Sequence, residues 1–312
     1  MSHVIKIGTR GSKLALWQAH HVADLLQNAG MKTQIVEIDT KGDQILDVSI
    51  SKIGSKGVFT QELEDQLTDG RIDIAVHSAK DMQSSLPEGF EIIAFTTREK
   101  ENDVLVSHDK SLSLKDSSRS IVIGTSSTRR VATLKHFYPH IKTVDVRGNL
   151  QTRIRKMEES GFDGLLLAFA GAHRMGFDEM IVEELDLNEF TPAVGQGSVA
   201  IEVSTRLDTE LKTKIAAACN DYFTGQKLKA ERAYLRVLEG GCSIPVFALA
   251  NLDGHTLHLK GGIVSLDGKE RISLQVSGAI SAPELIGEEL AAMVLAAGGK
   301  KILAAIKNQM NL

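Results

Sequence analysis

Ile72-Asp73-Ile74-Ala75-Val76-His77-Ser78-Ala79-Lys80-Asp81 carries the clearest structural signal in the chain. Its apolar first half predicts a strand at residues 72–76, and this strand runs directly into polar and charged side chains. In open α/β sheets, ligands bind outside the carboxyl ends of the strands. Asp81 would stand at such an end, where a carboxylate can stabilise a cation or move a proton, and Lys80 could hold an anionic substrate beside it. The alternative interpretation is a solvated turn after an edge strand.

Strands and helices alternate on both sides of this stretch, which predicts parallel βαβ units in two successive sets. In the first set we expect strands at 4–7 and 34–38 and helices at 14–29 and 59–67. In the second set we expect strands at 103–106, 121–123, 142–146 and 165–169 and helices at 129–137 and 150–159. A connector rich in Pro and Gly at 191–197 leads to a strand at 199–203, which could return to the first sheet.

The pattern changes after Cys219. A helix is expected at 224–238, strands around 257–259 and 272–274, and helices at 283–297 and 300–308, which together predict a small α+β domain. The fold class is therefore α/β with two lobes and an α+β C-terminal domain. The expected domains are 1–99 with 199–218, then 100–198, then 219–312.

Composition limits the classes of function. With 312 residues, 42% hydrophobic and 24% charged, and a mean hydropathy of −0.06, the chain reads as a soluble globular protein of two or three domains. A formal net charge of −4 argues against a general nucleic-acid or membrane-surface binder. The start of the chain lacks the apolar core of a signal peptide, and no stretch is apolar enough to span a bilayer. The two cysteines have no metal-type spacing, so neither a disulfide framework nor a zinc site is expected, and a cytoplasmic location fits best.

Arginine follows a predicted strand at Gly124-Thr125-Ser126-Ser127-Thr128-Arg129-Arg130. Free backbone N–H groups and hydroxyls at the start of a helix form an anion site. Cations at that end oppose the helix dipole by about 0.3–1 kcal/mol each, which a bound carboxylate or phosphate would offset. The alternative is a pair of solvated arginines on an exposed turn.

The same arrangement recurs at three other strand ends, in Asp145–Arg153, Ala170–Arg174 and Thr9–Ser12. Arginine's planar fork suits bidentate recognition of carboxylates, so we infer a ligand that bears several carboxylates, with phosphates as the other possibility. The sequence contains no complete phosphate-binding loop and no dinucleotide fingerprint.

Cys242 lies in the turn Gly240-Gly241-Cys242-Ser243-Ile244-Pro245. A lone cysteine is usually a small buried hydrophobe, but the flanking glycines and proline favour an exposed and therefore reactive thiol. Cys219 follows three alanines on an apolar helix face and is expected to be buried. The histidines show no metal spacing, and no metal site is expected.

These motifs, in this order, resemble the porphobilinogen deaminase (hydroxymethylbilane synthase) family over essentially the whole chain. The residues that carry the resemblance are Thr9-Arg10 with Ser12, Leu14 to Ala19, Lys56-Gly57 with Phe59, Ala75 to Asp81, Gly124 to Arg130, Arg147-Gly148-Asn149 with Thr152-Arg153, Pro192 to Gly197, and Glu239 to Cys242 with Pro245.

The resemblance implies two lobes like those of periplasmic binding proteins, an active site in the cleft between them, and a third domain. It implies a dipyrromethane cofactor linked by a thioether to Cys242, which primes the condensation of four porphobilinogen molecules with release of ammonia. Asp81 would be the catalytic carboxylate. The residues expected to bind carboxylates of cofactor and substrate are Arg10, Ser12, Lys52, Lys56, Ser78, Lys80, Thr125, Ser126, Ser127, Arg129, Arg130, Arg147, Gly148, Arg153, Arg174 and Gln196.

The chain departs from the family's usual pattern at a few positions. Met82-Gln83 stands where the family usually has Val-Pro, so we expect a less rigid loop after Asp81. His173 replaces a common lysine, which weakens any role for it in binding carboxylates. Residues 41–57 are a candidate lid over the cleft, or an ordinary surface loop.

Two other functions compete with this one. A two-lobed binding protein for an anionic solute would share the architecture, but it is normally exported and gives Cys242 no role. A nucleotide-dependent transferase is disfavoured by the missing phosphate loop. The expected protein is an enzyme, a monomer as in the family, with porphobilinogen as its partner and neither nucleic acid nor membrane.

Overall fold

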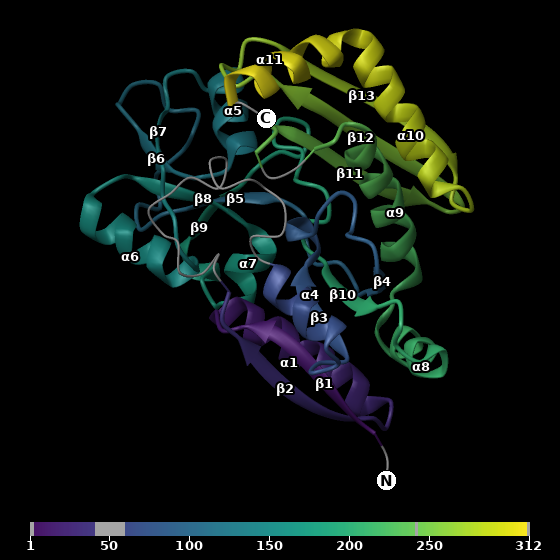
Figure 1. Ribbon diagram of the computed structural model, residues 1–312. Helices are drawn as coiled ribbons and strands as arrows, with labels where there is room; N and C mark the ends of the chain where they lie inside the picture. Colours follow the sequence, from purple (N-terminus) through teal and green to yellow (C-terminus); the bar gives the residue numbers. More distant parts are fainter. Residues whose placement is uncertain (1–2, 41–59, 241–242, 311–312) are drawn as a thin grey trace. The chain divides into compact units, whose positions relative to one another are not determined.

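The computed structural model describes residues 3–40, 60–240 and 243–310 (Figure 1). Its strands form three sheets, two of five strands and one of three. The contacts between residues divide the chain into two compact units. Residues 3–40, 60–99 and 197–225 belong to the first, and the remaining described residues belong to the second. The expected second and third domains therefore share one unit, and the three-domain division stays a prediction.

The first unit is built on a sheet in the order β2-β1-β3-β10-β4. β1 is parallel to β2 and β3, whereas β10 is antiparallel to both of its neighbours. The strands are β1 (Val4–Arg10), β2 (Lys32–Ile38), β3 (Ile74–Ser78), β4 (Phe90–Phe95) and β10 (Val199–Ser204).

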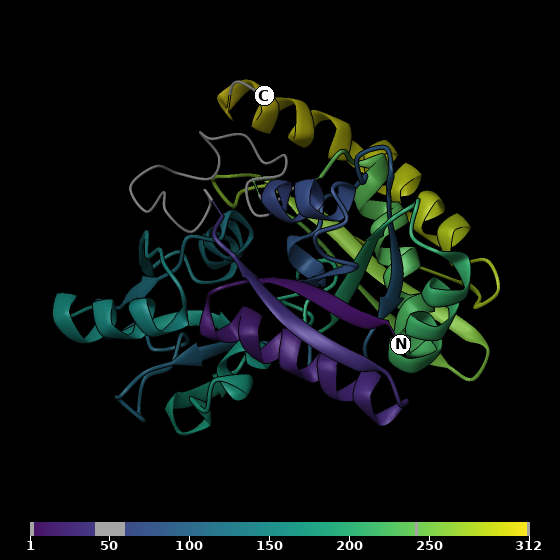
Figure 2. The same ribbon diagram turned by 60° about the horizontal axis from the view of Figure 1, so that its bottom comes forward.

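Helices cover both faces of this sheet. Figure 2 shows α1 (Lys13–Asn28) lying along β1 and β2, and α8 (Thr209–Cys219) packs beside α1 on the same face. α4 (Gln61–Thr68) covers the opposite face. Because strand side chains alternate, Ile74 and Val76 face α1 while Ala75 faces α4.

The second unit contains a sheet in the order β7-β6-β8-β5-β9, with the same sequence of directions: β6 is parallel to both neighbours and β5 is antiparallel to both. Its strands are β5 (Asp103–Val106), β6 (Val122–Gly124), β7 (Lys142–Val144), β8 (Gly164–Ala168) and β9 (Ile181–Glu184). Its helices are α5 (Thr128–Phe137), α6 (Leu150–Ser160) and α7 (Phe169–Arg174), and a short helix η2 (Asp178–Met180) precedes β9.

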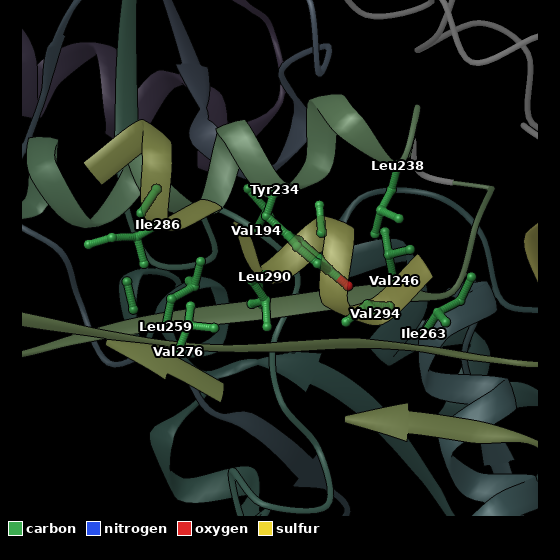
Figure 3. Packing of buried hydrophobic residues seen from close by; sticks show 14 of the residues in the cluster. Val194, Tyr234, Leu238, Val246, Leu259, Ile263, Val276, Ile286, Leu290 and Val294 are labelled. Carbon is green, nitrogen blue, oxygen red and sulfur yellow. The ribbon is translucent and has the colours of Figure 1, made fainter. Parts of the chain in front are cut away.

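The C-terminal part of the second unit packs helices on an antiparallel three-stranded sheet. Its elements are α9 (Tyr222–Val237), whose first residues belong to the first unit, β11 (Val246–Asp253), β12 (Thr256–Val264), β13 (Arg271–Ala279), α10 (Pro283–Val294), a π turn (Leu295–Gly299) and α11 (Lys300–Met310). Leu259, Leu290 and Tyr234 lie at its centre (Figure 3). The buried Tyr234 hydroxyl donates to the Gly262 carbonyl at 2.9 Å, which satisfies the one polar group of this side chain.

A buried carboxylate joins this part to the connector that follows β9. Glu231 of α9 is fully buried, and its two oxygens accept the N–H groups of Gly195 and Ala250, each at 2.9 Å. The Pro/Gly connector is thereby held by the C-terminal sheet and its helix within the second unit.

The expected fold class is confirmed, with two corrections. Wholly parallel βαβ units are wrong, because β5 and β10 enter their sheets antiparallel to their neighbours. β3 begins two residues later than expected and includes His77 and Ser78. The return of 199–203 to the first sheet is confirmed. Three strands were not predicted, β4, β9 and β11; the half-buried β4 and β9 have no alternation of buried and exposed residues over most of their length.

Candidate active site

Asp81 stands at the end of a pinned turn. After β3, the short helix η1 (Ala79–Asp81) turns the chain, the buried Ala79 donates its N–H to the Ser198 carbonyl at 2.9 Å, and Met82 is buried. Lys80 is half-buried, whereas Asp81 is exposed. The buried Ala79 and Met82 therefore hold the turn in place, while Asp81 between them remains exposed.

A pocket of the first unit brings together several predicted site residues. Arg10, Ser12, Ser78 and Asp81 line it, from β1, the start of α1, β3 and η1. Ser12 also begins α1, because its hydroxyl accepts the Ala15 N–H at 3.3 Å. Cationic, hydroxyl and carboxylate groups thus meet where two adjacent strands end and the segments that follow them begin.

Sequence reasoning missed three polar residues of this pocket. Gln18 is buried on α1 and donates from Nε2 to Ser78 Oγ at 2.8 Å, and Thr60 and His77 also line the pocket. A glutamine between Trp17 and the buried Ala19, on the apolar side of a helix, was the available signal.

Arg129 and Arg130 of the second unit are buried at the start of α5, where Asp103 of β5 pairs with both. Arg129 Nη1 lies 2.7 Å from Asp103 Oδ2, and Arg130 Nη2 lies 2.7 Å from Asp103 Oδ1. The predicted Gln196 belongs to the same cluster, because its Nε2 donates to Asp103 Oδ1 at 2.9 Å and to the Glu101 carbonyl at 2.7 Å. Asp103 was expected only as the first residue of a strand, with no role in the site.

The charges of this cluster do not cancel. Burial raises the pKa of Asp103, but the charges and hydrogen bonds of Arg129 and Arg130 outweigh it and hold that pKa well below the usual range. Burial lowers the pKa of Arg129, and Asp103 opposes that effect. Two guanidinium groups against one carboxylate leave one net positive charge at the start of α5, where the helix dipole also favours an anion.

The other predicted residues of the second unit take part in local hydrogen bonds. The Thr125 hydroxyl accepts the Ser127 N–H at 3.3 Å, and Ser127 Oγ caps α5 by accepting the Arg130 N–H at 3.5 Å. Arg153 donates to the Gly148 carbonyl at 2.8 Å, at a glycine with φ of 112°. Ser126, Arg147 and Arg174 are half-buried.

Three predicted residues, Cys242, Lys52 and Lys56, lie outside the described residues, as does the expected lid at 41–57. Cys219, the last residue of α8, is buried in the core of the first unit, as expected, and burial raises the pKa of its thiol to about 12. His173 lies with Nδ1 2.7 Å from Asp178 Oδ1 on an exposed surface.

Neither a membrane-spanning helix nor a cluster of metal ligands is present among the described residues. No helix there is long and apolar enough to cross a membrane. In that part of the chain, no three His, Cys, Asp or Glu side chains are grouped so that they could hold a metal ion.

Solved structures with some similarity to this chain include a double mutant of the VFT2 domain of Bordetella pertussis BvgS, with 17% identity, a TM-score of 0.44, and 69% of this chain and 86% of that chain covered. The methionine-binding protein MetQ has 14% identity and a TM-score of 0.44, with 69% of this chain and 89% of that chain covered.

Sequence relatives are far closer. A family model described as "Porphobilinogen deaminase, dipyromethane cofactor binding domain" matches residues 5–213, and one described as "Porphobilinogen deaminase, C-terminal domain" matches residues 226–296. Porphobilinogen deaminase of Desulfosudis oleivorans is 56% identical, with 98% of each chain covered. That of Cytophaga hutchinsonii is 57% identical over 100% of this chain and 99% of its own. The chain belongs to the porphobilinogen deaminase family.

Proposed function

We propose that this protein condenses four porphobilinogen molecules head to tail, releasing ammonia at each step, to give the linear tetrapyrrole hydroxymethylbilane. The family match supports the reaction, which is that of a transferase. The structural observation that supports it best is the turn that brings Asp81 into one pocket with Arg10, Ser12 and Ser78.

The donor groups fit the ligands. Each pyrrole of the substrate and of the dipyrromethane cofactor carries an acetate and a propionate, so both need several cationic and hydroxyl partners. Arg10, Ser12, Ser78 and Lys80 can supply them from the first unit. The second unit offers the net positive charge around Arg129 and Arg130, together with Arg147, Arg153 and Arg174. When bound, the dipyrromethane supplies the pyrrole carbon to which the first substrate is added.

Asp81 would act on the substrate amine and on the charge that its departure creates. Loss of ammonia leaves a methylene-pyrrole cation, and a fixed carboxylate nearby stabilises this charge as it develops. As a carboxylic acid, the same group can give its proton to the leaving amine, and the carboxylate that results can take up the proton that the new carbon–carbon bond displaces. Its exposed position at the edge of the pocket suits an exchange of protons with substrate.

Cys242 is the proposed attachment point of the cofactor through a thioether. The glycine-rich turn around it favours exposure, whereas Cys219 is buried with a raised thiol pKa and is therefore a poor nucleophile. The two cysteines of the chain thus divide into a proposed reactive thiol and a buried one.

The intact mass of the denatured protein tests this function. An excess mass of two linked pyrrole units, mapped to the peptide with Cys242, is expected after purification or after incubation with porphobilinogen. Cys219→Ser should keep the adduct and Cys242→Ala should lose it. An unmodified mass after incubation with porphobilinogen, or an adduct on another peptide, would contradict the proposal.

We further propose a cytoplasmic monomer. The two cysteines without disulfide or metal spacing support the compartment. Light scattering during size-exclusion chromatography should give one chain of 33.8 kDa, and a dimer mass would contradict the monomer.

A further inference from the structure

Charged residues are buried between the first sheet and α4. Ala200 of β10 pairs with His77 of β3, and Glu202 pairs with Ala75, so His77 and Glu202 lie on the same face of neighbouring strands. His77 Nε2 lies 3.0 Å from Glu202 Oε2, and the Glu202 side chain is completely buried. A carboxylate without water requires a positive charge or a proton close by.

Glu64 of α4 adds a second carboxyl to this layer. It is 3% exposed, and its pKa is raised chiefly by burial and further by the charges of Glu202 and Asp65, against the hydrogen bond of Thr60 and the charge of His77. One imidazole therefore faces two buried carboxyl groups, and His77, Glu202 and Glu64 together are here called the buried acid cluster.

The segment that carries Asp81 is attached to this cluster at both ends. His77 is the residue before Ser78, at the end of β3. Beyond η1, Gln83 donates from Nε2 to Glu64 Oε1 at 3.3 Å and to Thr60 Oγ1 at 3.3 Å. Residues 78–82 therefore lie between two anchors in one cluster.

The cluster also reaches the candidate active site. Thr60, which accepts from Gln83, and His77 both line the pocket that contains Asp81. In the described part of the chain no three such groups could hold a metal ion, so the cluster is not explained as a metal site. Its contacts on either side of residues 78–82 instead suit a role in holding the position of this turn.

We propose that Gln83 and the buried acid cluster are positioning residues that hold Asp81 at the distance its chemistry requires. The inference rests on the proposed function of Asp81. A catalytic group held by surrounding hydrogen bonds keeps its geometry, and a displacement near 1 Å can cost about 100-fold in rate. Gln83 supplies by its side chain the restraint that a proline at this position would supply by its ring.

The backbone of the turn offers a rescue variant. Met82 has φ of −70° and ψ of 141°, the extended conformation that a residue before proline prefers. Gln83→Pro would thus restrict the turn without the amide, while Gln83→Ala would remove the amide and leave the turn free.

The experiment compares kcat, KM and cofactor content of holoenzyme variants. Gln83→Ala should lower kcat about 10- to 100-fold with KM changed less than about threefold and the cofactor still bound. Gln83→Pro should recover most of this loss. The control is Gln27→Ala on the exposed end of α1, which should leave kcat unchanged. Gln83→Met, which keeps the length of the side chain without the amide, replaces the alanine variant if that one does not fold.

Two results would overturn the inference: a kcat of Gln83→Ala within twofold of the wild type, or equal losses in the alanine and proline variants. Asp81→Asn is measured alongside. If Asp81→Asn is inactive and Gln83→Ala is normal, the positioning role fails while the proposed function stands. If Asp81→Asn keeps its turnover, the assignment of Asp81 itself fails.

Discussion

Asp81 combines an exposed carboxylate with buried neighbours, because Ala79 and Met82 fix the turn on either side of it. A side chain held in this way loses little further freedom when it acts on a substrate, which is the physical advantage of placing it beside a strand end. Arg10 and Ser78, from the ends of two adjacent strands, line the same pocket.

Replacing Asp81 with Asn should therefore preserve the fold and abolish most turnover. The amide can neither stabilise the developing cation nor move the proton, so kcat should fall about 10²- to 10⁴-fold. Steady-state kinetics with porphobilinogen measures this loss. Asp69→Asn, at an exposed carboxylate paired with Arg71, is the matched control and should change kcat less than about twofold.

Asp103 illustrates a different use of a carboxylate, in which it holds two buried arginines in place. Asp103→Asn would leave Arg129 and Arg130 buried beside each other without a counter-charge, at an expected loss of about 3–5 kcal/mol in the free energy of unfolding. Urea denaturation measures this. Asp109→Asn, whose carboxylate contacts Arg119 at the surface, should cost far less than Asp103→Asn. Equal losses in the two variants would contradict the role of Asp103.

At the scale of elements, the layer between α4 and the first sheet contains buried charged side chains, namely Glu64, His77 and Glu202. Its apolar part is small, with Leu63 and Leu67 of α4 against Ile38 and Ile72, and Glu64 lies beside it. A carboxyl whose folded pKa is raised is most favourable while it is protonated, so its contribution to stability is lost as pH rises through that pKa.

Glu64→Gln should accordingly gain stability relative to the wild type as pH rises. Below 4.5, the ordinary pKa, both proteins carry a neutral group at residue 64, whereas above the raised pKa only the wild type must bury or neutralise a charge. The difference in Tm, variant minus wild type, should therefore be more positive at pH 8 than at pH 4. Thermal unfolding measures it, with Glu88→Gln on an exposed turn as control. A difference independent of pH would contradict the prediction.

Local patterns predicted the elements well where one face of a strand or helix is apolar. The helix at α5 shows helical spacing of its apolar residues, and the strands at β5 and β8 are short apolar runs of the usual strand length. β4 was missed because four of its six residues are only half-buried, so no alternation distinguishes it. The start of β3 was misplaced because Ile72 is apolar and buried although it lies outside the strand.

The site was predictable only in part, because a local sequence pattern does not show contacts between residues far apart in the chain. Arg10 and Ser78 are the last residues of strands and Asp81 lies three residues beyond one, and the apolar runs before them indicate this directly. The contacts of Gln83 with Glu64, and of Asp103 with Arg129, join residues 19 and 26 positions apart, so they depend on how the sheets assemble rather than on local pattern. Glu202 alone gave a hint, as a charge inside the apolar strand β10.

At the scale of the molecule, the first five-stranded sheet takes one strand from beyond the second sheet's segment of sequence. β10 follows all the strands of the second sheet, yet it lies between β3 and β4 of the first. β4 pairs with β10, so without β10 it has no partner in the described sheet.

A fragment ending at residue 196 should therefore leave the first sheet incomplete, whereas one ending at residue 225 contains every described element of that unit. Hydrogen exchange should show protected amides at Ile5, Ile7 and Ile74 in the longer fragment only. Both fragments contain β5 to β9, so the second sheet serves as an internal control. Equal protection of β1 and β3 in the two fragments would contradict this dependence on β10.

The position of β10 also sets the order in which the protein can assemble on the ribosome. By the time residue 99 has been made, β1 to β4 exist, but the strand that separates β3 from β4 is still about 100 residues away, roughly 5–20 s at usual rates of synthesis. The carbonyl of Ser198 that pins Ala79, and the carboxylate of Glu202 beside His77, arrive with that strand. The turn that carries Asp81 therefore gains its supports late in synthesis, and a nascent chain carries the catalytic sequence long before it has the catalytic geometry.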